Sequence, residues 1–132
     1  MAMIGISHVI LYVKNLEVSR HFYTSLIGLV RDVDAPGIET GWCWLWVGQP
    51  RAQRLALTTA SLPFSEHAPR PPFGPSHFAL GVPPRSITGI HTRLVQAGVH
   101  VRGPVQIDWT DAQTFYFRDP DQNLVRLWCW GL

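Results

Sequence analysis

The residues of this chain best suited to chemistry are two histidines and one arginine. His8 stands near the start of the apolar run "SHVILYV", and His77 holds the same place in the similar run "SHFALGV" 69 residues later. Arg126 interrupts the aromatic hairpin "FYFRDPDQNLVRLWCW", where Leu124 and Trp128 share its strand face. Imidazole can bind a metal or exchange a proton near neutral pH, whereas guanidinium is a permanent cation that binds anions. The chemistry expected of these positions therefore depends on what surrounds them.

The totals of the chain restrict the kinds of protein that it can be. It has 132 residues, 46% hydrophobic and 15% charged, which is typical of one globular domain rather than a disordered chain. A formal charge of +2 and no basic run argue against a nucleic-acid partner. No stretch approaches the roughly 20 apolar residues that span a bilayer, and nothing resembles a signal peptide. We expect a cytoplasmic protein with no membrane partner, in which Cys43 and Cys129 are reduced and buried.

An internal repeat sets the expected architecture. The two histidine runs align at a shift of 69 residues, and at a shift of 70 "LWVGQPRAQRLAL" aligns with "FYFRDPDQNLVRL" without a gap. Each copy is predicted to contain a strand, a helix and three further strands. The expected fold is therefore α+β, with two repeated βαβββ modules forming a curved mixed sheet around a cleft. Module one spans about 4–60, a proline-rich linker about 61–75, and module two about 76–132.

Apolar alternation and helix-end signals place the elements of each module. In module one, Asn15 should cap a helix from Leu16 to about Ile27, and Gly28 should end it. In module two, a helix is expected from about Ile87 to Gln96. The strands are expected at or near Ser7–Val13, Val30–Val33, Thr40–Gly48, Arg54–Thr59, His77–Val82, Val101–Ile107, Thr114–Arg118 and Leu124–Trp130.

This repeated module, with a histidine run opening each copy and "RDPDQNLVRL" in the final hairpin, resembles the vicinal oxygen chelate superfamily. Its members include glyoxalase I, fosfomycin-modifying thiol transferases, extradiol dioxygenases and the metal-free bleomycin resistance proteins. The resemblance covers nearly the whole chain and is most specific in the final hairpin. There, Gln122 replaces the family's turn glycine, which is a tolerable change because Asn123 can also adopt left-handed backbone geometry. In metal-using members, residues equivalent to positions 8, 77 and 126 hold a divalent metal, and glyoxalase-type members add one at position 56.

This chain departs from the superfamily pattern where the metal would be held. Arg126 replaces the metal-binding glutamate and Ala56 replaces the other carboxylate, whereas both histidines are retained. Guanidinium has no acceptor atom and would repel a cation bound between the histidines. We therefore predict no metal cofactor. A divalent metal would need a carboxylate from elsewhere, such as Glu39 or Asp108.

The pocket implied by the resemblance is lined by aromatic residues beside the arginine. In fosfomycin-modifying relatives the tyrosine of the final motif faces the cleft, which implies that Tyr116 and, by alternation, Thr114 point inward. The repeat then implies the same of two tryptophans in module one. Flat rings beside an arginine suit a planar aromatic acid, or a cationic drug held over the rings. The expected ligand-binding residues are His8, Trp44, Trp46, His77, Thr114, Tyr116, Arg126 and Trp128.

These residues also have ordinary structural explanations. Arg126 needs an anionic partner if it points inward, and that partner is either a ligand or a carboxylate of the chain. The tryptophans are equally explained as core residues or as a dimer contact. Asp119, Pro120 and Asp121 are fully explained by turn chemistry.

Three functions stay open. The first is a metal-free small-molecule-binding protein of the bleomycin-resistance kind, which holds an aromatic or anionic ligand in an aromatic cleft with Arg126 as anchor. The second is an enzyme: a metal-dependent lyase, thiol transferase or dioxygenase with a non-standard ligand set around His8 and His77, or a metal-free catalyst that uses either histidine as general base. The third is an accessory protein that acts through dimer contacts. Superfamily members usually pair, so we expect a homodimer.

Overall fold

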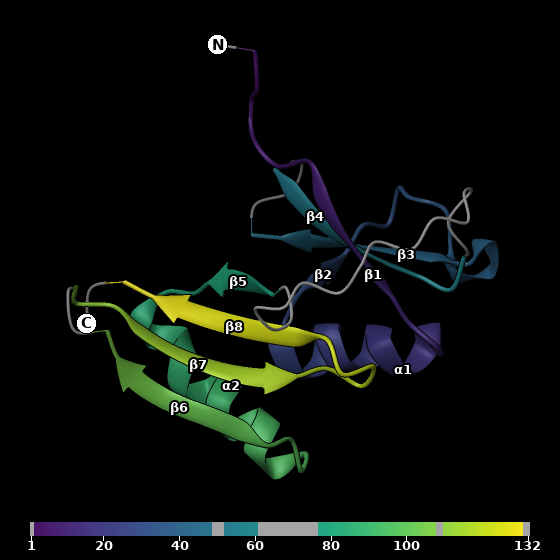
Figure 1. Cartoon of the computed structure of the whole chain (residues 1–132). Coiled ribbons are helices and arrows are strands. Elements are labelled where there is room, and N and C mark those ends of the chain that lie inside the picture. Colours follow the sequence, from purple (N-terminus) through teal and green to yellow (C-terminus); the bar gives the residue numbers. More distant parts are fainter. Residues whose placement is uncertain (1, 49–51, 61–76, 108–109, 131–132) are drawn as a thin grey trace, which may run out of the picture. The chain divides into compact units, whose positions relative to one another are not determined.

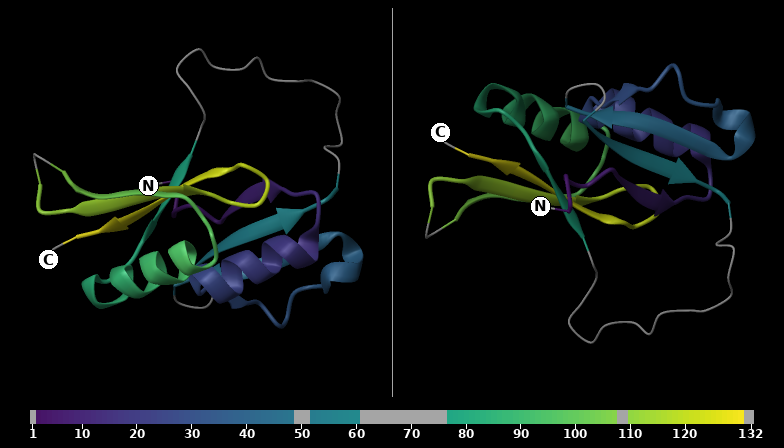
Figure 2. Two further views of the ribbon diagram at one scale, coloured as in Figure 1. Left: turned by 90° about the horizontal axis from the view of Figure 1, so that it is seen from below. Right: turned by 90° about the horizontal axis from the view of Figure 1, so that it is seen from above.

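The computed structural model describes residues 2–48, 52–60, 77–107 and 110–130. The chain divides into two compact units, residues 1–61 and 62–132. Each unit holds one four-stranded mixed sheet and one main helix (Figures 1 and 2). No helix in the described ranges is long and apolar enough to cross a membrane. The proline-rich linker predicted at about 61–75 lies outside the described residues.

The first unit follows the predicted order of one strand, one helix and three strands. Its strand order is β1-β4-β3-β2, with β1 parallel to β4 and the other neighbours antiparallel. A parallel pair requires a crossover connection, and the helix α1, which contacts β3 and β4, is part of it. The elements are β1 (His8–Tyr12), α1 (Leu16–His21) continued by η1 (Phe22–Ile27), β2 (Val30–Arg31), the short helix η2 (Ile38–Thr40), β3 (Trp42–Val47) and β4 (Gln53–Thr58).

The predicted end signals of the first helix are present in the structure. The side chain of Asn15 accepts a hydrogen bond from the Val18 N–H at 3.1 Å, which satisfies one of the free donors of the first turn. Gly28 ends the helical segment in the left-handed region, with φ of 98°. Between them, Phe22–Ile27 widens into a π-helical turn. The whole predicted helix is therefore present, in two continuous segments.

The second unit repeats the topology of the first, with strand order β5-β8-β7-β6 and β5 parallel to β8. The predicted α+β class with two similar modules is therefore confirmed. The second helix begins one turn earlier than predicted, because Pro84 suits the first turn of a helix, where its missing N–H has no partner to lose. The elements are β5 (Phe78–Gly81), α2 (Pro84–Gln96), β6 (Val101–Gln106), β7 (Gln113–Arg118) and β8 (Leu124–Cys129).

Each sheet packs one face against the helix of its own unit. Leu45, Leu55 and Leu57 form that buried layer in the first unit, as Phe115 and Leu127 do in the second. In Figure 1, α2 lies behind the strands β6, β7 and β8. We call the other face of each sheet its helix-free face. By cross-strand pairing it includes His8, Ile10, Tyr12, Trp42, Trp44, Trp46, Arg54, Ala56 and Thr58 in the first unit, and Ala79, Arg102, Thr114, Tyr116, Arg118, Leu124, Arg126 and Trp128 in the second.

The pairing of the outer parallel strands agrees with the predicted repeat. Ile10 lies opposite Ala56 in the first sheet, and Ala79 lies opposite Arg126 in the second. Ile10 and Ala79 are related by the shift of 69, and Ala56 and Arg126 by the shift of 70. The equivalence of Ala56 and Arg126, on which the comparison with metal-using relatives depends, is therefore supported by strand register.

The third strand of each module corrects the predicted alignment. Trp44 lies opposite Ala56, and Tyr116 lies opposite Arg126, so Trp44 corresponds to Tyr116 at a shift of 72. The gap-free alignment had paired Trp44 with Thr114 and is wrong here. The first hairpin has two more residues than the second between equivalent pairs. A shift of two residues keeps every side chain on its predicted face, because strand side chains alternate with a period of two.

Candidate functional site

On the helix-free face of the first sheet, an arginine lies over a tryptophan ring. Arg54 Cζ is 4.3 Å from the Trp44 ring centroid and 5.5 Å from that of Trp46. The ring of His8 meets Trp44 at 5.1 Å between centroids, with 74° between the ring planes. Asp32 completes the group, because its Oδ2 accepts a hydrogen bond from Arg54 Nη1 at 3.1 Å. We call these five residues the first cluster.

Asp32 fixes and neutralises the charge of Arg54. The Asp32 side chain is 8% exposed and that of Arg54 is 29% exposed. The second carboxylate oxygen of Asp32 accepts from the Asp34 N–H at 3.1 Å, so both oxygens are bonded. Contact with the rings adds about 0.5–1 kcal/mol at a partly exposed site. The arginine and carboxylate charges of the first cluster cancel within the unit.

The helix-free face of the second sheet carries a similar group. Arg126 Cζ lies 4.5 Å from the Tyr116 ring centroid and 5.2 Å from that of Trp128. The ring of His77 meets Tyr116 edge-on, at 6.0 Å between centroids. We call these four residues the second cluster. Because Trp44 and Tyr116 are equivalent positions, each unit presents one aromatic ring with a histidine in T-shaped contact and an arginine over its face.

The two clusters differ in how the arginine charge is met. Within the described ranges, no carboxylate pairs with Arg126. Its Nε is buried without a hydrogen-bond partner, and so is Nε1 of Trp128; in the described part of the chain these are the buried side-chain nitrogen and oxygen atoms that lack one. Both belong to β8, two positions apart on the same face. A buried donor left without an acceptor costs about 1–3 kcal/mol. An acceptor supplied by a ligand would remove that cost.

The structure groups the predicted site residues by unit. His8, Trp44 and Trp46 lie together in the first cluster, and His77, Tyr116, Arg126 and Trp128 in the second. Thr114 shares the face of the second cluster, but it is fully buried and its hydroxyl donates to the Leu127 carbonyl at 2.7 Å. Its only proton is therefore used by the main chain.

The residues at the superfamily's metal positions do not fit a divalent metal. Ala56 has no donor atom and is fully buried. A guanidinium is a donor with no acceptor atom, so Arg126 cannot be a metal ligand. In the described ranges, no group of three or more His, Cys, Asp or Glu side chains is placed to hold a metal. Of the two carboxylates considered as substitutes, Glu39 is exposed in η2, and Asp108 lies outside the described residues.

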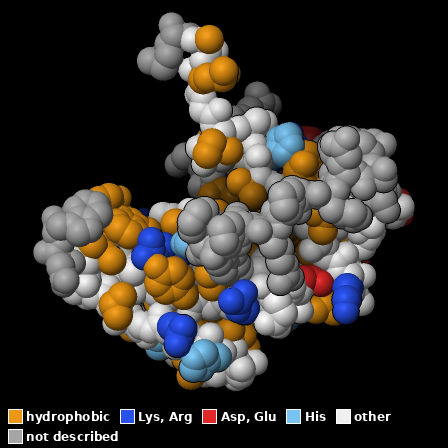
Figure 3. All heavy atoms as spheres, in the orientation of Figure 1, with side chains coloured by type: hydrophobic (Ala, Val, Ile, Leu, Met, Phe, Trp, Pro, Cys, Tyr) orange, Lys and Arg blue, Asp and Glu red, His pale blue; other side chains and the backbone are white. Residues whose placement is uncertain are grey.

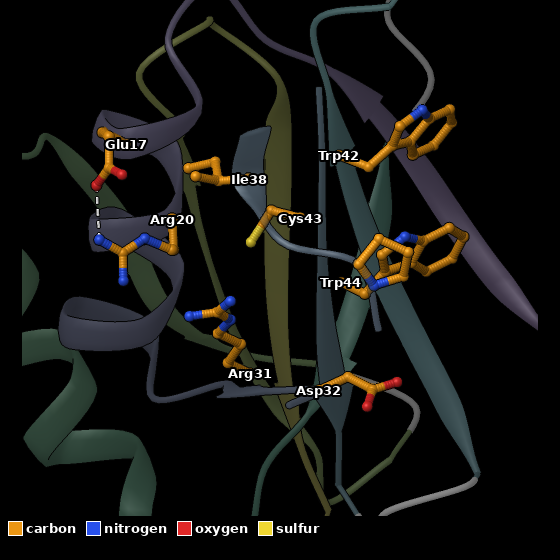
Figure 4. A pocket seen from close by; sticks show the side chains of 9 residues that line it. Glu17, Arg20, Arg31, Asp32, Ile38, Trp42, Cys43 and Trp44 are labelled. Atoms are coloured by element: carbon orange, nitrogen blue, oxygen red, sulfur yellow. Dashed lines mark hydrogen bonds and ion pairs between the residues drawn. The ribbon is translucent and has the colours of Figure 1, made fainter. Parts of the chain in front are cut away.

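A pocket of about 130 Å³ lies beside α1, on the helix side of the first sheet. Figure 4 shows the Cys43 thiol turned toward the Arg20 and Arg31 side chains, whereas the indoles of Trp42 and Trp44 lie on the other side of the strand. Burial raises the pKa of the Cys43 thiol, although both guanidinium groups oppose that shift. The thiol is therefore protonated at neutral pH and is not an activated nucleophile. The pocket is lined by Glu17, Arg20, Arg31, Asp32, Pro36, Ile38, Trp42, Cys43 and Trp44.

Arg54 and Asp32 are the cluster residues that sequence reasoning missed. Arg54 lies two residues before Ala56, so strand alternation places it on the same face, and that signal was sufficient to find it. Asp32 follows the two-residue strand β2 and pairs with a residue 22 positions away. No local sequence motif predicts that Asp32 pairs with Arg54.

Comparison with known proteins assigns the chain to a family. The model of the Glyoxalase/Bleomycin resistance protein/Dioxygenase superfamily matches residues 5–127. The chain belongs to this superfamily, as the sequence resemblance implied. No curated protein sequence matches the chain.

Solved structures show the same fold in proteins with different stated roles. A glyoxalase/dioxygenase from Nostoc punctiforme is 20% identical, with a TM-score of 0.75 over 97% of this chain and 92% of that one. TnmS3, an antibiotic-binding protein from a Streptomyces species, is 23% identical, with a TM-score of 0.69 over 99% of both chains. A lactoylglutathione lyase from Agrobacterium tumefaciens is 22% identical, with a TM-score of 0.70 over 100% of both chains. At these identities the likeness establishes the fold and not the activity.

Proposed function

We propose that this chain is a metal-free small-molecule-binding protein that holds an aromatic or anionic ligand, with Arg126 as anchor. The observation that carries this proposal is the buried Nε of Arg126, which has aromatic rings around its guanidinium and no acceptor in the described residues. A ligand carboxylate or other oxyanion would supply the acceptor, because guanidinium binds oxyanions through strong charge-assisted hydrogen bonds. The existence of an antibiotic-binding relative supports binding as a function that this fold can serve.

The rings beside Arg126 would supply the apolar part of the proposed site in the second unit. Tyr116 and Trp128 are partly exposed rather than buried in the core, and so are Trp44 and Trp46, which would bind a ligand on the first unit. Aromatic pairs contribute about 0.5–1.5 kcal/mol beyond the area that they bury. A planar ligand would therefore gain ring contacts in addition to its bond with Arg126.

The alternative metal-dependent activities lack the carboxylate residues that would bind the metal. A lyase, transferase or dioxygenase of the superfamily's metal-using kind needs carboxylate ligands, and this chain has Ala56 and Arg126 at those positions. Metal analysis of protein purified without chelators tests this directly. Bound divalent metal at one equivalent per chain would contradict the proposal.

We also propose that the protein is a homodimer. The apolar side chains Met3, Ile4 and Ile6 are exposed in this single chain, and exposed apolar groups of this kind are typical of contacts with a partner. Sedimentation analysis across a concentration series tests this point. A cytoplasmic location stays a prediction.

Tryptophan fluorescence against a panel of planar aromatic acids and cationic drugs tests the binding function. Arg126→Met should weaken acid binding at least tenfold, because a charge-assisted hydrogen bond is lost. Arg85→Met, which removes an exposed arginine from α2 of the same unit, is the charge-matched control and should leave binding unchanged. If no compound perturbs the emission and Arg126→Met alters neither binding nor stability, the cluster is not a binding site.

A further inference from the structure

The proposed function names an aromatic or anionic ligand without fixing its charged group, and the two unpartnered donors of the second cluster indicate what that group is. Resting on that function, we infer that the ligand carries a carboxylate, which Arg126 Nε and Trp128 Nε1 bind together. The ligand class is thus a planar aromatic carboxylic acid, and cationic drugs are excluded.

Two unpartnered donors side by side indicate a two-oxygen acceptor. Arg126 and Trp128 lie at positions i and i+2 of β8, and the guanidinium carbon is 5.2 Å from the Trp128 ring centroid. Their buried N–H groups both lack acceptors. A carboxylate has two oxygens on one planar group, so each oxygen can accept from one donor. A neutral amide offers one such oxygen and a cation offers none.

The electrostatics of the second helix-free face favour an anion. Arg102 lies opposite Tyr116 on this face, and Arg118 follows Tyr116 by two positions on the same strand. The described strand residues of this face include no Asp or Glu. In Figure 3, which views the second sheet from the side away from α2, blue arginine side chains stand among hydrophobic ones over this unit. Several positive groups without an acid concentrate anions at such a surface.

The first cluster does not compete for the acid group of the ligand. The rings of Trp44 and Tyr116 are also not free to bind a cation. Arg54 is already bonded to Asp32, so its charge is neutralised within the unit. The rings of Trp44 and Tyr116 each carry a guanidinium, at 4.3 Å and 4.5 Å from the centroid. A cationic ligand would have to displace one of these arginines or lie beside it against like charge.

Nuclear magnetic resonance of the full ¹⁵N-labelled chain tests the inference, because each arginine Nε–H and each indole N–H gives its own signal. The Arg126 and Trp128 signals are identified by their loss in Arg126→Met and Trp128→Phe. Both signals should shift on titration with 2-naphthoate, and neither with the neutral isostere 2-naphthamide. The Nε–H signal of the exposed Arg85, identified by its loss in Arg85→Met, is the internal control and should not shift.

Calorimetric affinities provide the second measurement. The acid 2-naphthoate should bind at least tenfold more tightly than 2-naphthamide, and 2-naphthylmethylamine should bind more weakly than the amide. Trp128→Phe should lower acid affinity about tenfold, because it removes the N–H and keeps a ring, and should leave amide affinity unchanged. Trp130→Phe alters an exposed tryptophan next to Trp128 and should change neither affinity.

The outcomes separate this inference from the proposed function. If acid and amide bind equally well and the two signals do not move, the carboxylate assignment is wrong but the binding function stands. Tighter binding of 2-naphthyl phosphate than of 2-naphthoate would move the assignment to a phosphate group. If none of the compounds binds up to its solubility limit, both the inference and the binding function fail.

Discussion

Both units place an arginine over an aromatic ring, yet they differ in whether a carboxylate pairs with it. In the first cluster Asp32 pairs with Arg54, and in the second no described carboxylate pairs with Arg126. An internal partner makes an ion pair part of the fold, whereas a buried donor without an acceptor lowers stability and is typical of a functional position. Arg54 is thus part of an internal ion pair, whereas Arg126 would be paired by a ligand under the proposed function.

Strand register explains why the two arginines meet different partners. The position equivalent to Arg126 in the first unit holds Ala56, and Arg54 lies two residues earlier on β4, opposite Trp46. From there Arg54 reaches the Trp44 ring diagonally and also reaches Asp32, which follows β2. Arg126 stands directly opposite its ring, Tyr116. The two arginines therefore contact equivalent rings from non-equivalent positions of their strands.

Of the predicted changes in stability, the largest should come from removing the carboxylate that pairs with Arg54. Asp32→Ala leaves the guanidinium of Arg54 without its partner and the Asp34 N–H without its acceptor. We expect the free energy of unfolding to fall by about 2 kcal/mol, less than for a fully buried pair because Arg54 is partly exposed. Denaturant unfolding measures this, with Asp34→Ala at an exposed position as control. A loss below about 0.5 kcal/mol would mean that the pair is no stronger than a surface salt bridge.

Two buried threonines, one in each unit, should give the next largest changes in stability. Thr58 and Thr114 each donate to a main-chain carbonyl, Gly41 at 2.8 Å and Leu127 at 2.7 Å. Thr58 also accepts from the Ala60 N–H at 3.0 Å. Thr58→Val should therefore cost about 1.5 kcal/mol and Thr114→Val about 1 kcal/mol, since only the former leaves a main-chain donor unpaired. Parallel denaturant titrations measure both, and equal losses would argue that the Ala60 bond contributes nothing.

The sequence allowed the elements and the face of each side chain to be predicted, because both depend on local patterns. Asn15 and Gly28 bound the first helix as their types indicate. Alternation placed Tyr116 and Arg126 on one face, and that survived a two-residue error in the alignment because parity is unchanged. Helix-end residues and strand alternation were therefore sufficient to predict the elements and the face of each side chain.

What could not be predicted depends on pairings between distant residues. The two extra residues of the first hairpin change which ring lies opposite which position, and only cross-strand hydrogen bonding fixes that register. The bond between Asp32 and Arg54 joins residues 22 apart without a motif. Whether Arg126 has an internal partner likewise depends on tertiary geometry, so the sequence left the ligand and the salt bridge as alternatives.

The turn of the second hairpin depends on local geometry that the residue types left open. Asn123 is able to adopt left-handed geometry, but in the structure Gln122 does so, with φ of 68°. The buried Asp119 carboxylate accepts from the N–H groups of Asp121 and Asn123 and from the Asn123 side chain. Two of those bonds hold Asn123 and the third holds Asp121, and the left-handed residue lies between them.

Relieving that turn should give a smaller effect, confined to the second unit. Gln122→Gly should raise the free energy of unfolding by about 1 kcal/mol, because glycine enters the left-handed region without the cost that a side chain imposes there. Gln122→Ala is the control and should be nearly neutral, since alanine keeps a Cβ. Thermal unfolding measures both variants. No gain for glycine would indicate that the bonds of Asp119 already hold the turn at no cost.

The smallest expected change comes from removing Arg126 itself in the absence of ligand. Arg126→Met loses ring contacts worth about 0.5–1 kcal/mol but also removes a buried Nε that has no acceptor. The two effects oppose each other, so we expect a net gain near 0.5 kcal/mol in the free energy of unfolding. Arg54→Met, by contrast, should cost about as much as Asp32→Ala, because it leaves the buried Asp32 carboxylate unpaired. If Arg126→Met proved as costly as Arg54→Met, Arg126 would have an internal partner after all. Both arginines would then be paired within the chain, and Arg126 would have no unpaired charge with which to bind a ligand.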